Sequence, residues 1–322
     1  MTKPLALFLD KASLYPEDLD FARLEGVADW RWFDNAKLAD IKESIHRAEI
    51  IVTNKVQISE VLLKECEQLK LICVAATGVN NVDITAAKQQ DITICNVRAY
   101  ATSSVVQHVF SLILSLNRHL FHYKKLVADG EWSRSDFFCY FGEPISSLDG
   151  KILGIIGYGE LGKAVAKVAK SFGMNVLIAQ SHDAEDGSSI QEGRVLLSDL
   201  LSMADVVTLH CPLTESNFHM IGEDELSVMK ADSILINTAR GGLVDEGALL
   251  NALQDKQISA AGLDVLEKEP PSAKHSLINY IADNLIITPH IAWASRESRQ
   301  NLIDAVADNI SAFQQGEPRN SL

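Results

Sequence analysis

The sequence predicts an α/β protein of two domains, each built around a parallel sheet. Short apolar runs alternate with helical patterns along most of its 322 residues, as in chains whose parallel strands are joined by helices. A glycine-rich turn between an apolar run and a helical pattern lies near the middle of the chain, and residues 1–99 contain none like it. The length suffices for two sizeable cores. We therefore expect two wound α/β units, of which only the second has a phosphate loop.

The composition is that of an ordinary globular protein, with 47% hydrophobic and 22% charged residues. The net charge of −14 argues against nucleic-acid binding, which needs a basic surface. No segment approaches the ~20 apolar residues of a membrane-spanning helix, and the run at 5–9 is too short for a signal peptide. The five cysteines form no C-x-x-C pair, which indicates buried thiols in a reducing compartment. We expect a cytoplasmic protein without nucleic-acid or membrane partners.

Residues 1–99 alternate predicted strands with predicted helices, which favours a parallel sheet covered on both faces. Apolar runs predict strands at 5–9, 30–33, 50–53, 71–75 and 92–97. Helical patterns follow at 17–24, 36–48, 59–66 and 84–89.

One long helix is predicted from Thr102 to Ala128. Thr102 or Ser103 would cap its start, and Gly130 follows its end. Its apolar residues cover more than one face, so we expect it to be buried on several sides, where it would join two domains or two subunits.

The irregular stretch at 129–150 is rich in aromatic side chains. They are Trp132, Phe137, Phe138, Tyr140 and Phe141. Such a stretch either covers the core or contacts another subunit, and we favour the subunit contact.

The sequence KILGIIGYGELG at 151–162 combines a buried strand, a glycine turn and a helix start. Gly157, Gly159 and Gly162 have the G-x-G-x-x-G spacing of a dinucleotide-binding fingerprint. The first would permit the tight turn, the second would let a pyrophosphate approach, and the third would let helix and strand pack closely. The helix N-terminus would attract the phosphates. The alternative is a structural turn in an ordinary sheet. The fingerprint residues are Gly157, Tyr158, Gly159, Glu160, Leu161 and Gly162.

A second α/β series follows this fingerprint. Its predicted strands lie at 152–156, 175–179, 206–210, 233–237, 259–263 and 285–288, with helices at 161–172, 196–203, 223–229 and 246–255. Six strands with helical crossovers match the order 3-2-1-4-5-6 of a Rossmann-type dinucleotide-binding domain. A last helix, predicted at 295–314, can cross back to pack on the first half.

Arg240 is the first candidate for chemistry. Ligands of open parallel sheets bind at the carboxyl ends of the strands, and Arg240 directly follows a predicted strand and precedes two glycines. A guanidinium offers two parallel donors to a carboxylate and stays charged, so it can hold a small α-keto acid and polarise its carbonyl. The alternative is a surface arginine near a helix end.

His290 and Glu269 form a second candidate group. Hydride transfer to a carbonyl needs a proton near neutral pH, where histidine titrates, and a carboxylate beside it would fix its tautomer. His290 follows a predicted strand and Pro289, whereas Glu269 could equally be a solvated loop charge. The sequence has no metal-binding motif such as H-E-x-x-H, and no G-x-S-x-G elbow of a serine hydrolase.

Several separate motifs, taken in order, resemble those of the D-isomer-specific 2-hydroxyacid dehydrogenase family over essentially the whole chain. They are AATGVNNVD (75–83), GIIGYGELG (154–162), HCPLT (210–214), INTARGGLVDE (236–246), GLDVLEKEP (262–270) and TPHIAWAS (288–295). Within the family, TNKV (53–56), NVRAYATSSVVQHVF (96–110) and HIAWAS are most similar to glycerate dehydrogenases, also called hydroxypyruvate reductases.

The resemblance implies a homodimer with two domains in each subunit. Residues 101–290 would be the NAD-binding Rossmann domain. Residues 1–100 with 291–322 would form a discontinuous, flavodoxin-like substrate domain. The substrate would be a small 2-keto or 2-hydroxy acid.

The resemblance also implies roles for single residues. Arg240 would bind the substrate, His290 would be the acid–base catalyst, and Glu269 would hold its proton. Further cofactor-binding candidates are Gln180, His210, Cys211, Pro212, Thr238, Ala239 and Asp264, the last facing the nicotinamide. Further substrate-binding candidates are Lys55, Thr77, Gly78, Val79 and Trp293.

The cofactor preference depends on the end of the second strand, where NAD-preferring members carry an acidic residue. Here that place is Gln180, which can bond a ribose but does not repel a 2′-phosphate. The stretch 181–193 contains no Lys or Arg but does contain Asp183, Glu185, Asp186 and Glu192. We therefore favour NAD and leave NADP open.

The predicted reaction is the NAD(P)-dependent reduction of hydroxypyruvate to D-glycerate, or of glyoxylate to glycolate, and the reverse oxidation. One rival is formate or phosphite oxidation on the same scaffold, although formate enzymes of the family carry a glutamine where Glu269 stands. A rival of another class is an NADH-binding sensor or corepressor that keeps the fold without its chemistry.

Overall fold

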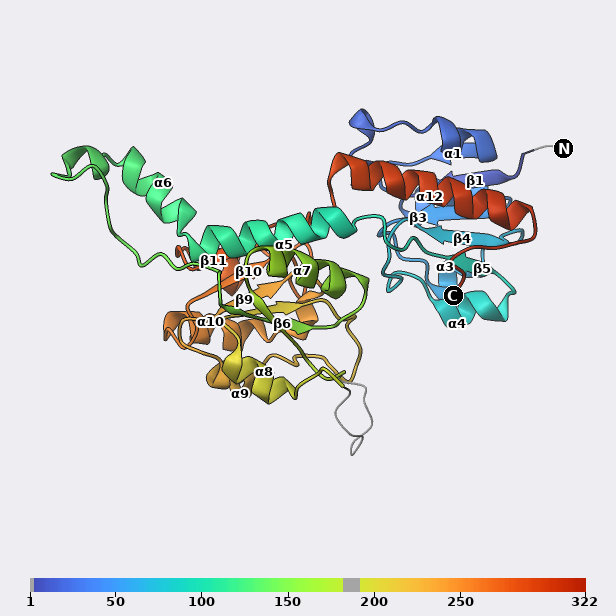
Figure 1. Ribbon diagram of the computed structural model, residues 1–322. Helices are drawn as coiled ribbons and strands as arrows, with labels where there is room; N and C mark the ends of the chain where they lie inside the picture. The colour runs from blue at the N-terminus through green and yellow to red at the C-terminus, as the bar shows by residue number, and fades with distance from the viewer. Residues whose placement is uncertain (1–2, 182–191) are drawn as a thin grey trace. The chain divides into compact units, whose positions relative to one another are not determined.

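The structure, a computed structural model, describes residues 3–181 and 192–322, and it divides into two compact units (Figure 1). Unit 1 comprises Met1–Ala101 and Trp293–Leu322, and unit 2 comprises Thr102–Ala292. The chain thus crosses from one unit to the other after Ala101 and again after Ala292, rather than after residues 100 and 290.

Unit 1 is built on a five-stranded parallel sheet. The strands are β1 (Leu5–Phe8), β2 (Asp29–Trp32), β3 (Ile50–Thr53), β4 (Leu71–Val74) and β5 (Thr93–Cys95). Their spatial order is β2-β1-β3-β4-β5, which is the flavodoxin order 2-1-3-4-5. β3 and β4 are buried on both faces, which explains their continuous apolar runs. The expected flavodoxin-like sheet is confirmed.

Helices cover both faces of this sheet. They are α1 (Ala22–Val27), α2 (Leu38–Ile45), α3 (Glu60–Leu63), α4 (Ile84–Gln89) and α12 (Arg296–Gln314), with 3₁₀ turns at Lys11–Leu14 and Pro16–Asp18. α12 returns from the far end of the sequence and buries Leu302, Val306 and Ile310 in the same core as β1 and β4. Arg299 on α12 forms a bidentate ion pair with Asp18, at 2.6 and 2.8 Å, which lowers the pKa of that carboxyl group.

Unit 2 is built on a six-stranded parallel sheet. The strands are β6 (Ile152–Ile156), β7 (Asn175–Ile178), β8 (Val206–Leu209), β9 (Ile234–Asn237), β10 (Ala260–Leu263) and β11 (Leu285–Ile287). They lie in the order β11-β10-β9-β8-β6-β7, which is 2-1-3-4-5-6 when counted along the chain. The expected count of six strands is confirmed, but the expected order 3-2-1-4-5-6 is not observed, because the segment next to β7 is reduced to a single bridge between Ala179 and Val195. Counting this bridge as the third strand restores the Rossmann order.

The helices of unit 2 include α5 (Thr102–Asn117), which lies over the sheet beside α7 (Glu160–Ser171) (Figure 1). A Cβ added to Gly262 on β10 would lie 3.1 Å from a side-chain atom of Leu112, so α5 approaches the sheet very closely. The other helices are α6 (Leu120–Ala128), α8 (Leu197–Met203), α9 (Glu223–Val228), α10 (Glu246–Gln254) and α11 (Ser276–Asn279), with 3₁₀ turns at Trp132–Arg134 and Gly241–Leu243.

The prediction of one helix from Thr102 to Ala128 is wrong, because the helix is interrupted between α5 and α6. His119 has a left-handed backbone with φ of +49°, and its Nε2 lies 3.0 Å from the Pro144 carbonyl oxygen. Asn117, the last residue of α5, donates to the Ser146 carbonyl at 2.7 Å. These tertiary contacts hold the break, which the apolar period of the sequence does not reveal.

The aromatic segment at 129–150 is not a cover for the core. Phe137, Phe138 and Phe141 are 74%, 91% and 88% exposed. In Figure 1, α6 and the segment after it project away from the sheet of unit 2 as an arm. The alternative of core cover is therefore wrong for this chain by itself.

Candidate active site

The glycine fingerprint forms a tight turn at the carboxyl end of β6. Gly157 has φ of +94°, and a Cβ there would lie 2.5 Å from the Cys211 nitrogen. A Cβ on Gly162 would lie 2.2 Å from the Gly157 carbonyl oxygen, so the start of α7 packs directly on the turn. A Cβ on Gly159 would meet no atom within 4 Å, because this glycine faces open space. The three glycines therefore have different physical tasks, as the spacing predicts.

A cleft of about 580 Å³ lies beside this turn, at the carboxyl ends of β6, β7 and β8. Its lining includes seven predicted cofactor-binding residues: Gly157, Tyr158, Gly159, Gln180, His210, Cys211 and Pro212. Glu160, Leu161 and Gly162 begin α7 next to it, where the first N–H groups of a helix have no partners within the helix. The cleft fits a dinucleotide, since Gly159 leaves room for a pyrophosphate at a helix N-terminus.

His210 supplies a neutral imidazole to this cleft. Burial lowers the pKa of His210 to about 4, so the ring carries no charge near neutral pH. Its Nε2 lies 3.0 Å from the Thr208 hydroxyl oxygen. Its Nδ1 is buried and has no hydrogen-bond partner among the residues that the structure describes. A ligand group in the cleft could pair with this nitrogen.

Arg194 is a cleft residue that the sequence prediction missed. It lines the cleft together with Gln180 and Ser181, and its Nη1 donates to the Ala179 carbonyl at 3.0 Å. Arg194 directly follows the stretch 181–193, which contains no Lys or Arg. The bridge between Ala179 and Val195 brings this part of the chain back to the end of β7. Of the acidic residues predicted to disfavour a phosphate there, Asp183, Glu185 and Asp186 lie outside the described residues, whereas Glu192 lies in an exposed turn.

Glu269 and His290 lie together, although 21 residues separate them in the sequence. Nδ1 of His290 is 2.6 Å from Oε2 of Glu269, and the other carboxylate oxygen accepts a hydrogen bond from the Leu266 N–H at 2.9 Å. The side chains are 27% and 34% exposed, so both remain accessible to solvent. The pair fixes Nδ1 as the ring nitrogen of His290 that faces the carboxylate, so Nε2 faces away from it.

Arg240 follows β9, as predicted, and is partly buried. Its Nη1 donates to the carbonyl of Ala239 at 2.6 Å, and its own carbonyl accepts from Asn237 at 2.8 Å. A Cβ on the neighbouring Gly241 would lie 1.9 Å from the Leu266 carbonyl carbon, so the Arg240 turn packs against the loop that leads to Glu269. Thr238 and Ala239, in the same turn, are not among the described residues lining the glycine cleft.

Asp264 has different surroundings from those expected of a residue facing the nicotinamide. It is 1% exposed, and its carboxylate accepts hydrogen bonds from the Thr288 hydroxyl and from the N–H groups of Ile291 and Ala292, at 2.6 to 2.9 Å. These bonds occupy both carboxylate oxygens. The Asp264 side chain therefore holds the loop after His290, and its contact with a cofactor stays a prediction.

The predicted substrate-binding residues other than Arg240 belong to unit 1. Lys55 is exposed in a turn after β3, and buried Asp10 accepts the N–H groups of Asn54, Lys55 and Val56 at 2.6 to 3.1 Å. Asp10 is thus a positioning residue that the sequence prediction missed, although it directly follows the first strand.

Three of the other four residues, Thr77, Gly78 and Val79, follow β4. The Thr77 hydroxyl donates to the Val97 carbonyl at 2.8 Å, and Gly78 and Val79 are partly buried beside it. Trp293 packs edge-on against Tyr100, with ring centroids 6.3 Å apart. Within unit 1, Lys55 and the turn at Thr77 therefore both lie at the carboxyl edge of the sheet.

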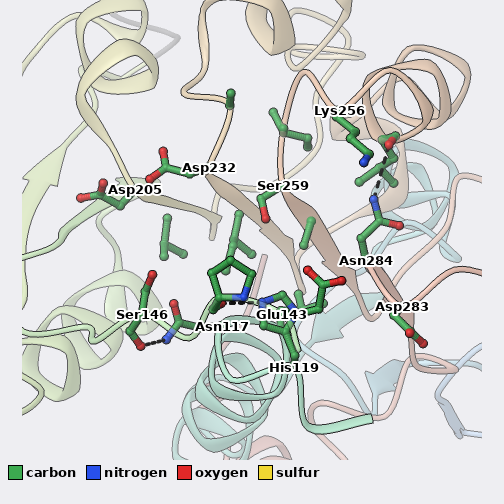
Figure 2. Close-up of a pocket in the computed structure, with 18 of the residues that line it drawn as sticks. Asn117, His119, Glu143, Ser146, Asp205, Asp232, Lys256, Ser259, Asp283 and Asn284 are labelled. Atoms are coloured by element: carbon green, nitrogen blue, oxygen red, sulfur yellow. Dashed lines mark hydrogen bonds between the residues drawn. The ribbon is translucent and has the colours of Figure 1, made fainter. Parts of the chain in front are cut away.

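A second cavity, of about 590 Å³, lies at the amino ends of the strands of the unit 2 sheet, opposite to the glycine cleft (Figure 2). Residues at the starts of β6, β8, β9, β10 and β11 line it, among them Lys151, Asp205, Ile234, Ser259 and Asn284. Asn117, His119, Glu143 and Ser146, from the base of the arm, line it too. The bonds from Asn117 to Ser146 and from His119 to Pro144 cross this region, so the cavity lies where the arm is anchored to the sheet.

Two further features concern the described residues as a whole. No group of three or more His, Cys, Asp or Glu side chains at 3–181 and 192–322 has an arrangement that could hold a metal ion. Within the same ranges, no helix has the length and apolar character needed to cross a membrane.

Comparison with known proteins finds relatives over nearly the whole chain. Residues 110–292 match the family model of the D-isomer specific 2-hydroxyacid dehydrogenase NAD-binding domain. The chain is 44% identical to glycerate dehydrogenase of Methylorubrum extorquens over 321 residues, 99% of each chain. It is 37% identical to hydroxypyruvate reductase of Blautia hydrogenotrophica over 318 residues, 97% of each chain.

A solved structure extends the comparison to three dimensions. The NADPH-dependent glyoxylate/hydroxypyruvate reductase of Sinorhizobium meliloti, in complex with NADP and malonate, superposes with a TM-score of 0.83 at 26% identity. The match covers 100% of this chain and 97% of that chain. From its two parallel sheets, its glycine cleft and these full-length matches, the chain belongs to the D-isomer specific 2-hydroxyacid dehydrogenase family and is an NAD(P)-dependent oxidoreductase.

Proposed function

We propose that the protein reduces hydroxypyruvate to D-glycerate, and glyoxylate to glycolate, and catalyses the reverse oxidations. The observation that carries this proposal is the pair of His290 and Glu269, with 2.6 Å between Nδ1 and Oε2. The pair supplies a positioned proton donor in the unit that carries the dinucleotide cleft. The relatives described as glycerate dehydrogenase and hydroxypyruvate reductase support this substrate class.

The chain's own residues would act on the keto acid as binders and proton carriers. When bound, the nicotinamide supplies or accepts the hydride. The Arg240 guanidinium would bind the substrate carboxylate and polarise the carbonyl through charge-assisted hydrogen bonds. His290 would give a proton from Nε2 to the carbonyl oxygen during reduction and take it back during oxidation. The Glu269 carboxylate would hold the Nδ1 hydrogen of His290 and so keep Nε2 as the nitrogen that faces the substrate. Lys55, Thr77, Gly78, Val79 and Trp293 are the substrate-binding candidates from unit 1.

The direct test is a steady-state assay of NADH and NADPH oxidation with a panel of 2-keto acids. We expect the highest kcat/KM with hydroxypyruvate, followed by glyoxylate. Tight NADH binding without turnover of any keto acid would instead support the sensor or corepressor. Oxidation of formate or phosphite in the same assay would support the remaining rival, although the carboxylate at Glu269 argues against the formate reaction.

Arg194 bears on the choice between NAD and NADP. Its guanidinium lines the cleft next to Gln180, where a ribose 2′-phosphate would need a positive charge. The cleft therefore accepts NADP as well as NAD in this proposal, in contrast to the preference for NAD suggested by the acidic stretch alone.

Replacing Arg194 with leucine is expected to lower kcat/KM for NADPH by about tenfold while changing kcat/KM for NADH much less. The reason is the loss of one charge-assisted contact, worth roughly 1.5–3 kcal/mol. Arg194→Lys keeps the charge and is the matched control. Equal losses with both cofactors would mean that Arg194 only supports the local structure.

The arm is proposed to form a homodimer. Besides Phe137, Phe138 and Phe141, the arm exposes three further apolar side chains. Leu120, Phe121 and Trp132 are 52%, 54% and 48% exposed, so one chain alone leaves a large apolar surface in water. Contacts of Asn117 and His119 anchor the arm's base, which keeps this surface projecting. A second copy of the chain presents the same surface and can bury it in a closed, two-fold arrangement.

The double substitution Phe138→Asp and Phe141→Asp is expected to shift the protein from dimer to monomer, because both changes place charges in the proposed interface. Analytical ultracentrifugation measures the shift. Val61→Asp, at a 65% exposed position of unit 1, is the matched control and should remain dimeric. A wild-type protein that sediments as a monomer would contradict the proposal.

A further inference from the structure

A chain of polar groups connects α5 to the loop that carries His290, all within unit 2. The His108 ring on α5 places Nε2 2.9 Å from the Thr288 hydroxyl oxygen. Thr288 follows β11, and its hydroxyl lies 2.6 Å from Oδ1 of Asp264. His108 Nε2 is itself 3.5 Å from the same carboxylate oxygen. The roles proposed above for the strand-end residues include neither His108 nor Thr288.

The hydrogen-bond directions in this chain are determined by chemistry. The Asp264 carboxylate can only accept, so the single hydroxyl hydrogen of Thr288 must point to it. The Thr288 oxygen must then accept from His108, which therefore carries its hydrogen on Nε2. The hydrogen bonds are therefore donated in one direction, from the His108 ring to the Thr288 hydroxyl and from that hydroxyl to the buried Asp264 carboxylate.

Asp264 in turn binds the backbone of His290 and of the two residues after it. Its carbonyl oxygen accepts the His290 N–H at 2.8 Å, and its carboxylate accepts the N–H groups of Ile291 and Ala292 at 2.9 and 2.8 Å. His290 has a left-handed backbone, with φ of +56°, which a non-glycine residue adopts only when its surroundings hold it there. Ser104, one turn before His108 on α5, donates to the Ala292 carbonyl at 2.7 Å. The loop is therefore held from both sides.

We propose that His108 and Thr288 are positioning residues for the reaction, which orient His290 through the Asp264 carboxylate. The proposal rests on the proposed role of His290 as the proton donor. Neither His108 nor Thr288 lines the glycine cleft among the described residues, so their effect reaches the reaction through the loop. Without the Thr288 hydroxyl, Asp264 loses its orienting donor, and the Nε2 atom of His290 would no longer be held at one position. A shift of about 1 Å in a catalytic group can reduce a rate by roughly 10²-fold.

The test compares two pairs of variants that differ by single groups. Thr288→Val removes the hydroxyl at nearly constant shape, whereas Thr288→Ser keeps it. His108→Leu removes the donor, whereas His108→Gln keeps an N–H near the position of Nε2. We expect the valine and leucine variants to lose about tenfold or more in kcat with hydroxypyruvate, and to keep their KM for NADH within about twofold. The serine and glutamine variants should retain most of the wild-type kcat.

Other outcomes would overturn the proposal. If Thr288→Val and Thr288→Ser have the same kcat, the hydrogen bonds from His108 to Asp264 only stabilise the fold. The same holds if the variants have a lower Tm but an unchanged kcat. If Thr288→Val does not fold, the comparison of His108→Leu with His108→Gln decides. His290→Asn is measured in parallel: full activity of that variant would contradict the proposed function itself, whereas its inactivity beside unaffected Thr288 and His108 variants would contradict only the positioning role.

Discussion

Replacing His290 with asparagine is expected to lower the rate of hydroxypyruvate reduction by roughly 10²-fold or more. Asparagine can still bond a neighbour, but it cannot carry a proton that is released near neutral pH. The proton for the substrate oxygen would then have to come from water, at the cost of general acid catalysis. The measurement is kcat for NADH oxidation at saturating hydroxypyruvate.

Glu269→Gln is the matched control for this prediction. Glutamine keeps an oxygen that can accept the Nδ1 hydrogen of His290, which lies 2.6 Å from the carboxylate in the native pair. It removes only the negative charge beside the ring, so a smaller loss of kcat is expected than for His290→Asn. A variant His290→Asn with near-native kcat would show that the proton reaches the substrate by another route.

The variant Arg240→Ala is expected to lose essentially all turnover while it binds NADH almost as well as the native protein. Two parallel hydrogen bonds between a guanidinium and a carboxylate are each worth roughly 1.5–3 kcal/mol, so a loss of about 10³-fold in kcat/KM for the keto acid is expected. NADH binding should persist because Arg240 is not one of the described residues that line the glycine cleft. A fluorescence titration with NADH and a steady-state assay measure the two effects separately.

Arg240→Lys tests the geometry of the same contact. Lysine keeps the positive charge but offers no planar pair of donors, so an intermediate activity is expected. Loss of NADH binding by Arg240→Ala, together with normal residual turnover, would contradict the assignment of this residue to the substrate.

Much of the fold could be predicted from the sequence because parallel strands buried on both faces are continuous apolar runs. The predicted strands at 50–53 and 152–156 have the same bounds as β3 and β6, and the helix at 84–89 has those of α4. The break at His119 could not be predicted in this way. It depends on contacts with Pro144 and Ser146, which are 25 and 29 residues away from their partners in the sequence. Such distant contacts leave no trace in the local apolar period.

The candidate site shows the same division between local and distant causes. Gly157, Gly159 and Gly162 are recognisable because each answers a local steric demand, two of them where a Cβ would collide with backbone atoms. Arg194 was missed because its place in the cleft depends on the bridge between Ala179 and Val195. The bonds of the Asp264 carboxylate to the loop after His290 were not predicted, because a strand-end position alone does not show which groups a carboxylate accepts.

The sequence by itself determined the α/β class, the glycine turn and the residue types that chemistry at this site requires, because these follow from apolar periodicity and from steric limits within a few residues. Only the tertiary structure decided that Glu269 faces His290 across 21 positions, that the Asp264 carboxylate accepts N–H groups of the His290 loop, and that His108 reaches that loop from α5. Hydrogen bonds between distant segments have this dependence because their geometry exists only after the sheet has brought the strand ends together.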